Sequence, residues 1–324
     1  MQVFALGSNG SGQLGLGHEE DAWKPTAVEI PIPPSMKSDT IKDIVAGGNH
    51  TLILMHSGDV YATGANEDGR CGSRQERLLS FERVSTSLSE IGRVALCAAT
   101  WQASILVTGN RKFVLTRGTG FKGELGLGPD KQQAPIDLEI ADVHACMGHA
   151  VAVFSNGEVH GWGSGKQGQL GEPLEDVWRP RKIKEVPFKA LRAVCGKDFT
   201  AVFGDPKEGK IMILGPKRDR FGIKANAPKS VPGWKDLLAW GRNDHGQLPP
   251  PGLPTLQCIR AGSEHMLAMT SSEKVLVWGW GEHGNCGLPV DDRSDVKERW
   301  NELVVQGTVK SLGAGCATSW IVAD

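Results

Sequence analysis

The chain has 324 residues, and its 36 Lys and Arg nearly balance its 37 Asp and Glu, which gives a net charge of -1. This balance argues against a general nucleic-acid or anionic-membrane surface, so we expect neither as a direct partner. The first residues show no basic start and no long apolar run, so the sequence predicts neither a signal peptide nor a membrane span. The seven cysteines include no CxxC pair. We therefore expect reduced thiols in the cytosol or nucleus, with no metal ion or other cofactor.

A short Gly-rich phrase returns seven times along the chain, and each copy follows two strand-like runs. The phrases open at Gly7, Gly64, Gly118, Gly163, Gly215, Gly241 and Gly279. The intervals between them are 57, 54, 45, 52, 26 and 38 residues, and five of these six suit a four-stranded propeller blade. The first strand, MQVFALG, and the last, ATSWIVAD, complete one further blade if they pair with each other. The sequence therefore predicts an all-β, seven-bladed β-propeller, a single domain over residues 1–324, with both termini in one shared blade.

Hairpin turns divide the strand-like runs within each unit. Residues 57–58, 109–110, 156–157 and 272–273 each lie between two β-prone runs and carry Gly, Asn, Ser or Glu. No segment has a sustained apolar stripe of helical period, so we expect almost no helix.

One interval is too short for a full blade. Only 26 residues separate Gly215 from Gly241, and Pro228 and Pro232 lie within that stretch. Proline removes a backbone donor and disfavours a central strand. We expect a shortened fifth blade with two or three strands, and the sequence leaves open whether a loop and strand have been lost from it.

The chemical motifs of enzymes are missing from the sequence. No GxSxG elbow and no HExxH helix occurs, and the Gly phrases lack both the following helix and the Lys-Ser/Thr of a phosphate loop. We therefore expect a binding protein rather than an enzyme.

Residues that vary at equivalent repeat positions are the candidates for partner binding. Repeat stacking should place such positions along one rim, and a rim with aromatic, His and acidic side chains has the composition of a protein-binding hot spot. The candidates are Trp101, Asp198, Phe199, Glu264, His265, Trp280 and His283. An alternative stays open for the histidines of the AGxxH turns, which could instead cap turns by hydrogen bonds to the backbone.

The phrases GSNGSGQLGLG at Gly7, AGGNHTLILMHSGDVYATG at Ala46 and AGSEHMLAMTSSEKVLVWGWGEHGNCG at Ala261 resemble the repeat of the regulator of chromosome condensation family. The resemblance covers essentially the whole chain. It implies a seven-bladed propeller closed by its two ends, and a role in binding other proteins.

Four segments are similar to a fungal group of that family, the killer-toxin-insensitivity or alpha-tubulin suppressor propellers: GKDF (196–199), GSEH (262–265), WGWGEHGNCG (278–287) and GAGCATSWIV (313–322). This resemblance implies a heterodimer with a small zinc-containing electron-carrier protein of diphthamide synthesis. It also implies support for Elongator-dependent modification of wobble uridines in tRNA. The alternative that the wider family suggests is nucleotide exchange on a Ran-type GTPase.

Overall fold

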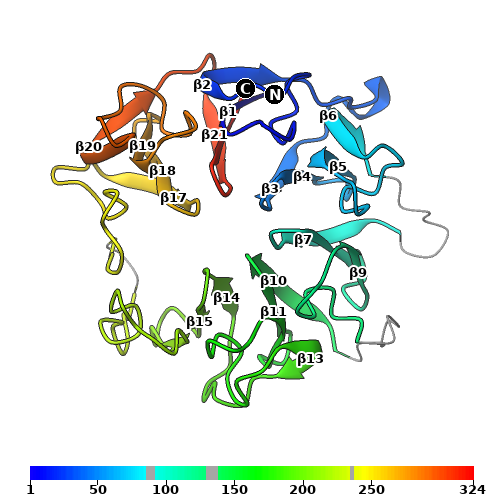
Figure 1. Cartoon of the computed structure of the whole chain (residues 1–324), viewed down its shortest axis with the longest axis vertical. Coiled ribbons are helices and arrows are strands. Elements are labelled where there is room, and N and C mark those ends of the chain that lie inside the picture. The colour runs from blue at the N-terminus through cyan, green and yellow to red at the C-terminus, as the bar shows by residue number, and fades with distance from the viewer. Residues whose placement is uncertain (85–91, 129–137, 234–236) are drawn as a thin grey trace. The chain divides into compact units, whose positions relative to one another are not determined.

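The computed structural model describes residues 1–84, 92–128, 138–233 and 237–324, which fall into two compact units. Unit 1 joins Met1–Thr86 with Arg242–Asp324, and unit 2 holds Ser87–Gly241. The described residues form antiparallel strands and one 3-10 helix, η1 (Pro34–Met36), as Figure 1 shows. Over these same residues, no helix has the length and apolar character needed to cross a bilayer.

Unit 1 contains three four-stranded sheets. The first has the order β2-β1-β22-β21, the second β3-β4-β5-β6 and the third β17-β18-β19-β20. Their strands are β1 (Gln2–Gly7), β2 (Ala22–Val28), β3 (Ile41–Ala46), β4 (His50–Met55), β5 (Val60–Ala65), β6 (Arg77–Arg83), β17 (Leu256–Ala261), β18 (His265–Thr270), β19 (Val275–Trp280), β20 (Asp295–Leu303), β21 (Val309–Ala314) and β22 (Thr318–Ala323).

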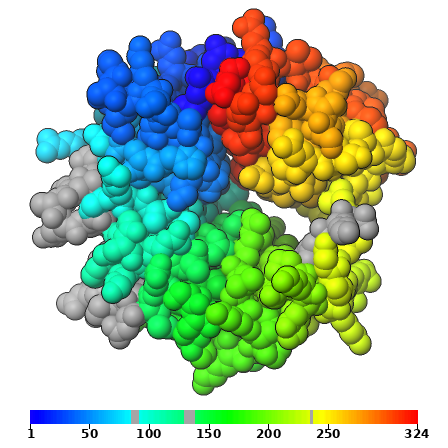
Figure 2. Space-filling model, turned by 180° about the vertical axis from the view of Figure 1, so that it is seen from behind, coloured from blue at the N-terminus to red at the C-terminus, as the bar shows by residue number. Residues whose placement is uncertain are grey.

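The two ends of the chain share one sheet of unit 1. β1 pairs with β22 over its whole length, from Gln2 opposite Ala323 to Gly7 opposite Thr318. In Figure 2 the dark blue first residues and the red last residues lie directly side by side. This arrangement confirms the predicted pairing of the terminal strands.

Unit 2 contains one four-stranded and two three-stranded sheets among its described residues. Their orders are β7-β8-β9, β10-β11-β12-β13 and β14-β15-β16. The strands are β7 (Val94–Ala99), β8 (Ala103–Thr108), β9 (Val114–Gly118), β10 (Ile140–Cys146), β11 (His149–Phe154), β12 (Val159–Gly163), β13 (Val177–Lys182), β14 (Arg192–Cys195), β15 (Thr200–Phe203) and β16 (Ile211–Leu214). The first strands β7, β10 and β14 pack side by side, as they do in successive propeller blades.

The prediction of seven blades is wrong, because the described residues form six sheets. The expected shortened blade does not form as a sheet: between β16 and β17, residues 215–233 and 237–255 contain no strand and make one isolated bridge, between Lys210 and Ser230. Twenty-six residues with Pro216, Pro228 and Pro232 cannot supply three strands and their turns. The sixth Gly phrase, which opens at Gly241, therefore follows no sheet of its own.

The second strand of each sheet supplies most of the core. β4, β11 and β18 read HTLILM, HAVAVF and HMLAMT, and nearly all of their residues are buried, since sheets cover both of their faces. The predicted hairpin turns follow these strands. Gly58 and Gly157 have φ of 89° and 86°, and Glu273 takes a positive φ of 63°.

Five of the Gly phrases, those that open at Gly7, Gly64, Gly118, Gly163 and Gly279, fold as the same double turn. In the first copy, the Gly12 amide donates to the Asn9 carbonyl and the Gly15 amide donates to the Gly12 carbonyl, at 2.8 and 2.9 Å. The Asn9 side-chain oxygen accepts the Leu14 amide at 2.9 Å, which closes the loop. The Asn66 and Asn243 side chains accept the equivalent amides of Cys71 and Leu248. The recurring sequence thus encodes a loop of fixed shape at the end of the third strand.

The double turns join neighbouring sheets. The carbonyl of the seventh residue in the phrase accepts a hydrogen bond from a side chain of the next sheet in four copies. These pairs are Gln13 with Thr51, Glu124 with Trp162, Gln247 with Trp278, and Asn285 with Ser319. The phrase that follows no sheet, Gly241–Leu248, makes this bond like the others. It therefore belongs structurally to the sheet β17-β18-β19-β20.

Candidate protein-binding site

Trp280, the last residue of β19, lies between two imidazole rings on the surface of unit 1. The His245 ring is centred 6.2 Å from the indole, and the His283 ring is centred 5.6 Å from it in a perpendicular, edge-on arrangement. Both histidines occupy the fifth position of a Gly phrase, directly before its central Gly. The common loop shape therefore places two histidines beside one tryptophan, and we call Trp280, His245 and His283 the Trp280 patch.

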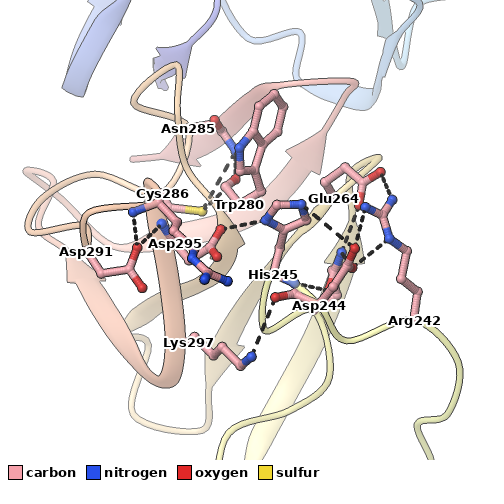
Figure 3. Close-up of polar contacts among 12 residues, drawn as sticks. Arg242, Asp244, His245, Glu264, Trp280, Asn285, Cys286, Asp291, Asp295 and Lys297 are labelled. Carbon is pink, nitrogen blue, oxygen red and sulfur yellow. Dashed lines mark hydrogen bonds and ion pairs between the residues drawn. The ribbon is translucent and has the colours of Figure 1, made fainter.

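A carboxylate holds each imidazole of the patch in place. His245 Nδ1 lies 2.8 Å from the Asp295 carboxylate, which is buried at the start of β20, as Figure 3 shows. His283 Nδ1 lies 2.9 Å from the Asp21 carboxylate, directly before β2. Because the carboxylates accept at Nδ1, the His283 Nε2 remains to interact with a partner, whereas the His245 Nε2 lies 4.0 Å from the Asp244 carboxylate. The rings are thus oriented before any partner arrives, which lowers the entropic cost of binding.

A charged network borders the patch beside His245. The Arg242 guanidinium contacts Asp244 at 2.6 Å and Glu264 at 2.5 Å (Figure 3). The Gln247 amide donates to Glu264 at 2.8 Å. The hydrogen bond from Arg242 lowers the pKa of Asp244 to about 2 and, reciprocally, these carboxylates raise the pKa of Arg242. The network therefore keeps two negative charges and one positive charge at the edge of the indole.

Beneath the indole, two buried side chains fix the Trp280 backbone. Asn285 Nδ2 donates to the Trp280 carbonyl at 2.7 Å, and the Cys286 thiol approaches the same carbonyl at 3.4 Å. Burial raises the pKa of the Cys286 thiol, so this sulfur stays protonated and unreactive. The support is polar but closed to solvent, which suits a rigid binding surface rather than a reactive centre.

The structure brings together three of the predicted partner-binding residues. Glu264, Trp280 and His283 all lie in or beside the Trp280 patch, and all are partly exposed. Their proximity follows from the sheet, since the Trp280 amide donates to the Glu264 carbonyl across the β18–β19 ends.

His265, the fourth predicted residue in unit 1, is buried at 2% exposure. Its Nε2 lies 3.0 Å from the Ser319 hydroxyl of the neighbouring sheet, and burial lowers its pKa to about 4. His149 makes the equivalent contact with the Thr200 hydroxyl in unit 2. The structure thus places His265 at a seam between sheets and not on an exposed rim. A backbone hydrogen bond to Thr318 also acts on the His265 ring, as the alternative of a cap through the backbone expected, and the contact with the Ser319 hydroxyl is additional.

The other predicted residues lie in unit 2. Trp101 is 39% exposed in the loop between β7 and β8, where its amide donates to the Met147 carbonyl at 2.7 Å. Asp198 and Phe199 are half-buried in the loop before β15, and the Phe199 carbonyl accepts the Gly196 amide at 2.9 Å. Partner contacts by these three residues stay a prediction.

Sequence reasoning missed Arg242, Asp244, His245 and Asp295. A signal for His245 was present, because GRNDHGQL aligns with GWGEHGNCG and places His245 and His283 at the same phrase position. Asp295 at the start of β20 likewise corresponds to Asp21 and Asp176, which directly precede β2 and β13. The ion pair of Arg242 with Glu264 had no comparable signal, because it connects residues 22 positions apart, whereas Asp244 lies only two positions from Arg242.

Comparison with known proteins gives the context of this site. The family model described as the regulator of chromosome condensation (RCC1) repeat matches residues 2–54 and 156–203, and a second RCC1 repeat model matches residues 41–70. An RCC1 repeat-containing protein of Schizosaccharomyces pombe is 30% identical, and the alignment covers 99% of each chain. The chain belongs to the RCC1 repeat family. That alignment spans 364 positions, 40 more than the 324 residues present, so this RCC1 protein lacks segments that its relative has.

Other relatives show the same architecture. The secretion-regulating guanine nucleotide exchange factor of Mus musculus is 28% identical over 88% of this chain and 75% of its own length. The crystal structure of Saccharomyces cerevisiae Prp20p, described with its binding properties to Gsp1p and histones, superposes with a TM-score of 0.80 at 19% identity, covering 99% of this chain and 90% of Prp20p. At that identity the likeness shows the fold alone. The six sheets are accordingly blades of an RCC1-type, all-β propeller.

Proposed function

We propose that this RCC1 protein is a non-enzymatic scaffold that grips a protein partner through the Trp280 patch. The observation that carries the proposal is the indole between two carboxylate-held imidazoles, bordered by the Arg242 network. A partly exposed aromatic anchor with a polar, charged border is the composition of an interface hot spot. In the described part of the chain, no group of three or more His, Cys, Asp or Glu gathers as metal ligands would.

For the partner, we propose a small zinc-containing electron-carrier protein of diphthamide synthesis, with the pair also supporting Elongator-dependent wobble-uridine modification in the cytosol or nucleus. The support is the similarity of GKDF, GSEH, WGWGEHGNCG and GAGCATSWIV to the killer-toxin-insensitivity group. Two of these four segments contribute residues to the Trp280 patch or its border, since Glu264 lies in GSEH and Trp280 and His283 lie in WGWGEHGNCG.

Replacing Trp280 tests the proposed surface. We expect Trp280→Ala to weaken the partner at least about 30-fold, because truncating a hot-spot aromatic costs about 2 kcal/mol or more. The measurement is affinity purification of the tagged chain from cells, followed by titration calorimetry with the recovered partner. Phe113→Ala, which truncates a 50% exposed aromatic at the β8–β9 turn, is the matched control and should leave affinity unchanged. Equal affinity for the two variants would place the interface elsewhere.

The second candidate function is nucleotide exchange on a Ran-type GTPase. The support is the relationship to the murine exchange factor and the fold shared with Prp20p. A nucleotide-release assay with Ran and with the GTPase that co-purifies, if one does, separates the candidates. Under the scaffold proposal, a small zinc protein dominates the purified complex and nucleotide release stays at its intrinsic rate. If the protein accelerates nucleotide release and Trp280→Ala does not, the scaffold proposal is wrong and the protein is an exchange factor that acts through the Trp280 patch.

A further inference from the structure

The strandless segment after β16 concentrates positive charge. Residues 216–230 (PKRDRFGIKANAPKS) contain five basic residues and one acidic residue. Subtracting them from the totals of 36 and 37 leaves 31 basic and 36 acidic residues in the rest of the chain. The near-neutral charge of the whole chain therefore conceals a segment of net +4 beside a remainder of net -5.

The basic side chains of this segment face solvent. All five are exposed, and none forms an ion pair with another residue that the structure describes. They are Lys217, Arg218, Arg220, Lys224 and Lys229. By contrast, exposed bases elsewhere in the described chain often have a partner, as Lys182 has in Glu158 and Lys274 has in Glu302.

The single carboxylate of the segment is turned inward. Asp219 Oδ2 accepts the Lys224 and Ala225 amides at 3.0 and 2.8 Å, and Asp219 Oδ1 is buried. The carboxylate is therefore used to fold the loop and does not shield the bases from a ligand. The loop is closed further by a hydrogen bond from the Trp240 indole to the Ile223 carbonyl at 2.8 Å. Five cations are thus presented on a folded loop rather than on a free tail.

An aromatic ring lies in the middle of these cations. Phe221 directly follows Arg220 and is 45% exposed, although a large apolar side chain is normally buried. Exposed aromatic rings interleaved with Lys and Arg form the stacking platforms on which proteins hold single-stranded nucleic acid.

We propose that the loop 217–229 binds single-stranded nucleic acid, with the basic side chains on phosphates and Phe221 stacked on a base. An acidic protein segment would also meet the charges, but it has no use for a partly exposed ring directly after Arg220, whereas every nucleobase offers a face to stack. This site is separate in sequence from the Trp280 patch and does not depend on its function.

Fluorescence anisotropy with labelled oligonucleotides tests the proposal on the full-length protein. We expect oligouridylate and oligothymidylate of about 20 nucleotides to bind with an affinity that falls steeply with salt. The triple variant Lys217→Gln/Arg218→Gln/Arg220→Gln should bind at least about tenfold more weakly, and its salt slope should fall by about 2, since each lost phosphate contact removes about 0.7. Phe221→Ala should weaken binding about fivefold or more without changing the salt slope, because it removes stacking alone.

The matched control is Lys24→Gln/Lys112→Gln/Lys184→Gln, which removes the same charge from exposed sites outside the loop and should bind like the parent. Equal losses in the two triple variants, or no binding by the parent at low salt, would overturn the proposal. So would oligoglutamate binding as tightly as the oligonucleotides, since that result assigns the loop to an acidic protein. A preference between uridylate and thymidylate tells whether RNA or DNA is the ligand, and circular dichroism melts confirm that each variant is folded.

Discussion

At the scale of single residues, Arg242 is the side chain that organises the border of the Trp280 patch. Its guanidinium contacts Asp244 in its own loop and Glu264 before β18. It therefore links the phrase Gly241–Leu248 to the sheet β17-β18-β19-β20. The three side chains are each partly exposed, and solvent screens such pairs strongly. Arg242 therefore matters more for the charge pattern of the surface than for stability.

Replacing Arg242 should change the pKa of Asp244 clearly but the free energy of unfolding only slightly. In Arg242→Ala we expect the pKa of Asp244 to rise from about 2 toward its ordinary value of 3.8, because the hydrogen-bonding cation is gone. A depressed carboxylate pKa adds stability that is present above the unfolded pKa and is lost as pH falls through the folded one. The variant should therefore lose a small stabilisation at neutral pH and none below about pH 2.

Carboxylate NMR titration of the two proteins measures this shift. Lys297→Ala is a suitable control, because its ammonium donates to the Asp244 backbone carbonyl, at 3.5 Å, and not to the Asp244 carboxylate. An unchanged Asp244 titration in Arg242→Ala would show that the ion pair does not persist in solution.

Residue-level sequence reasoning predicted part of this site. Trp280 and His283 were predicted because aromatic, His and acidic side chains together have the composition of a protein-binding rim. His265 was expected on the same surface, but its ring fills the space between two sheets, and a sequence does not show on which side of a strand end an imidazole packs. Arg242 was missed because its contact with Glu264 joins residues 22 positions apart.

At the scale of elements, the Gly phrase is the structural unit that repeats most faithfully. The Gly that opens it closes the third strand with a positive φ, and in most copies it also lies against the backbone of the second strand. At Gly279, φ is 107°, and a Cβ would lie 2.6 Å from the Glu264 carbonyl oxygen and 2.7 Å from His265 Cα. Glycine is therefore required there by conformation and by space together.

A pair of alanine substitutions separates these two requirements. We expect Gly279→Ala to lower the free energy of unfolding by about 3 kcal/mol or more, because it adds a backbone clash to the strain of positive φ. Gly252→Ala has a φ of 78° but meets no atom within 4 Å, so strain alone should cost about 1 kcal/mol. Urea unfolding measures both, and equal losses would mean that the sheet ends relax around the new methyl group.

The sequence predicted the elements well because their signals are local. Turn residues at 57–58, 109–110, 156–157 and 272–273 and the buried runs TLILM and AVAVF are short-range patterns, and the structure has hairpins there. The seams were not predicted, since a bond such as His149 to Thr200 joins residues 51 positions apart.

At the scale of the whole molecule, buried neutral histidines make stability depend on acid. Burial lowers the pKa of His50 and His149 to about 3 and that of His144 and His265 to about 4, from an unfolded value of 6.5. Below pH 6.5 the unfolded chain binds these protons and the folded chain does not. Their contribution to stability is therefore complete above pH 6.5 and declines as pH falls toward the folded values.

The expected slope is about 1.4 kcal/mol per pH unit for each such histidine. His265→Gln keeps a group that can hydrogen-bond to Ser319 but cannot bind the proton, so between pH 6.5 and 4.5 its unfolding free energy should fall less steeply by about that amount. Urea unfolding at a series of pH values measures the slope. The exposed His18→Gln is the control and should keep the parent's dependence of unfolding free energy on pH. If His265→Gln also kept that dependence, His265 would not be a neutral buried group that gains its proton on unfolding.

The number of blades was the largest error at this scale. Seven phrases predicted seven sheets, but no strands lie between β16 and the phrase that opens at Gly241. The RCC1 relative from Schizosaccharomyces pombe requires 40 alignment positions beyond this chain, comparable to the length of one blade interval. Counting Gly phrases therefore overestimates the number of sheets. The phrase at Gly241 is held by hydrogen bonds to the sheet that follows it, so it can form without a sheet before it.

The bonds of Arg242, His245 and Gln247 to the following sheet carry a consequence for how such proteins change over time. Since each corner loop is secured by its downstream neighbour, a deletion that removes three strands can leave the corner in place and correctly shaped. We therefore expect the unit that can be gained or lost to run from just after one corner loop through the next three strands. Engineers who wish to shorten or lengthen these propellers should cut directly before the corner, at a position like Gly241, and keep the loop with the blade that it serves.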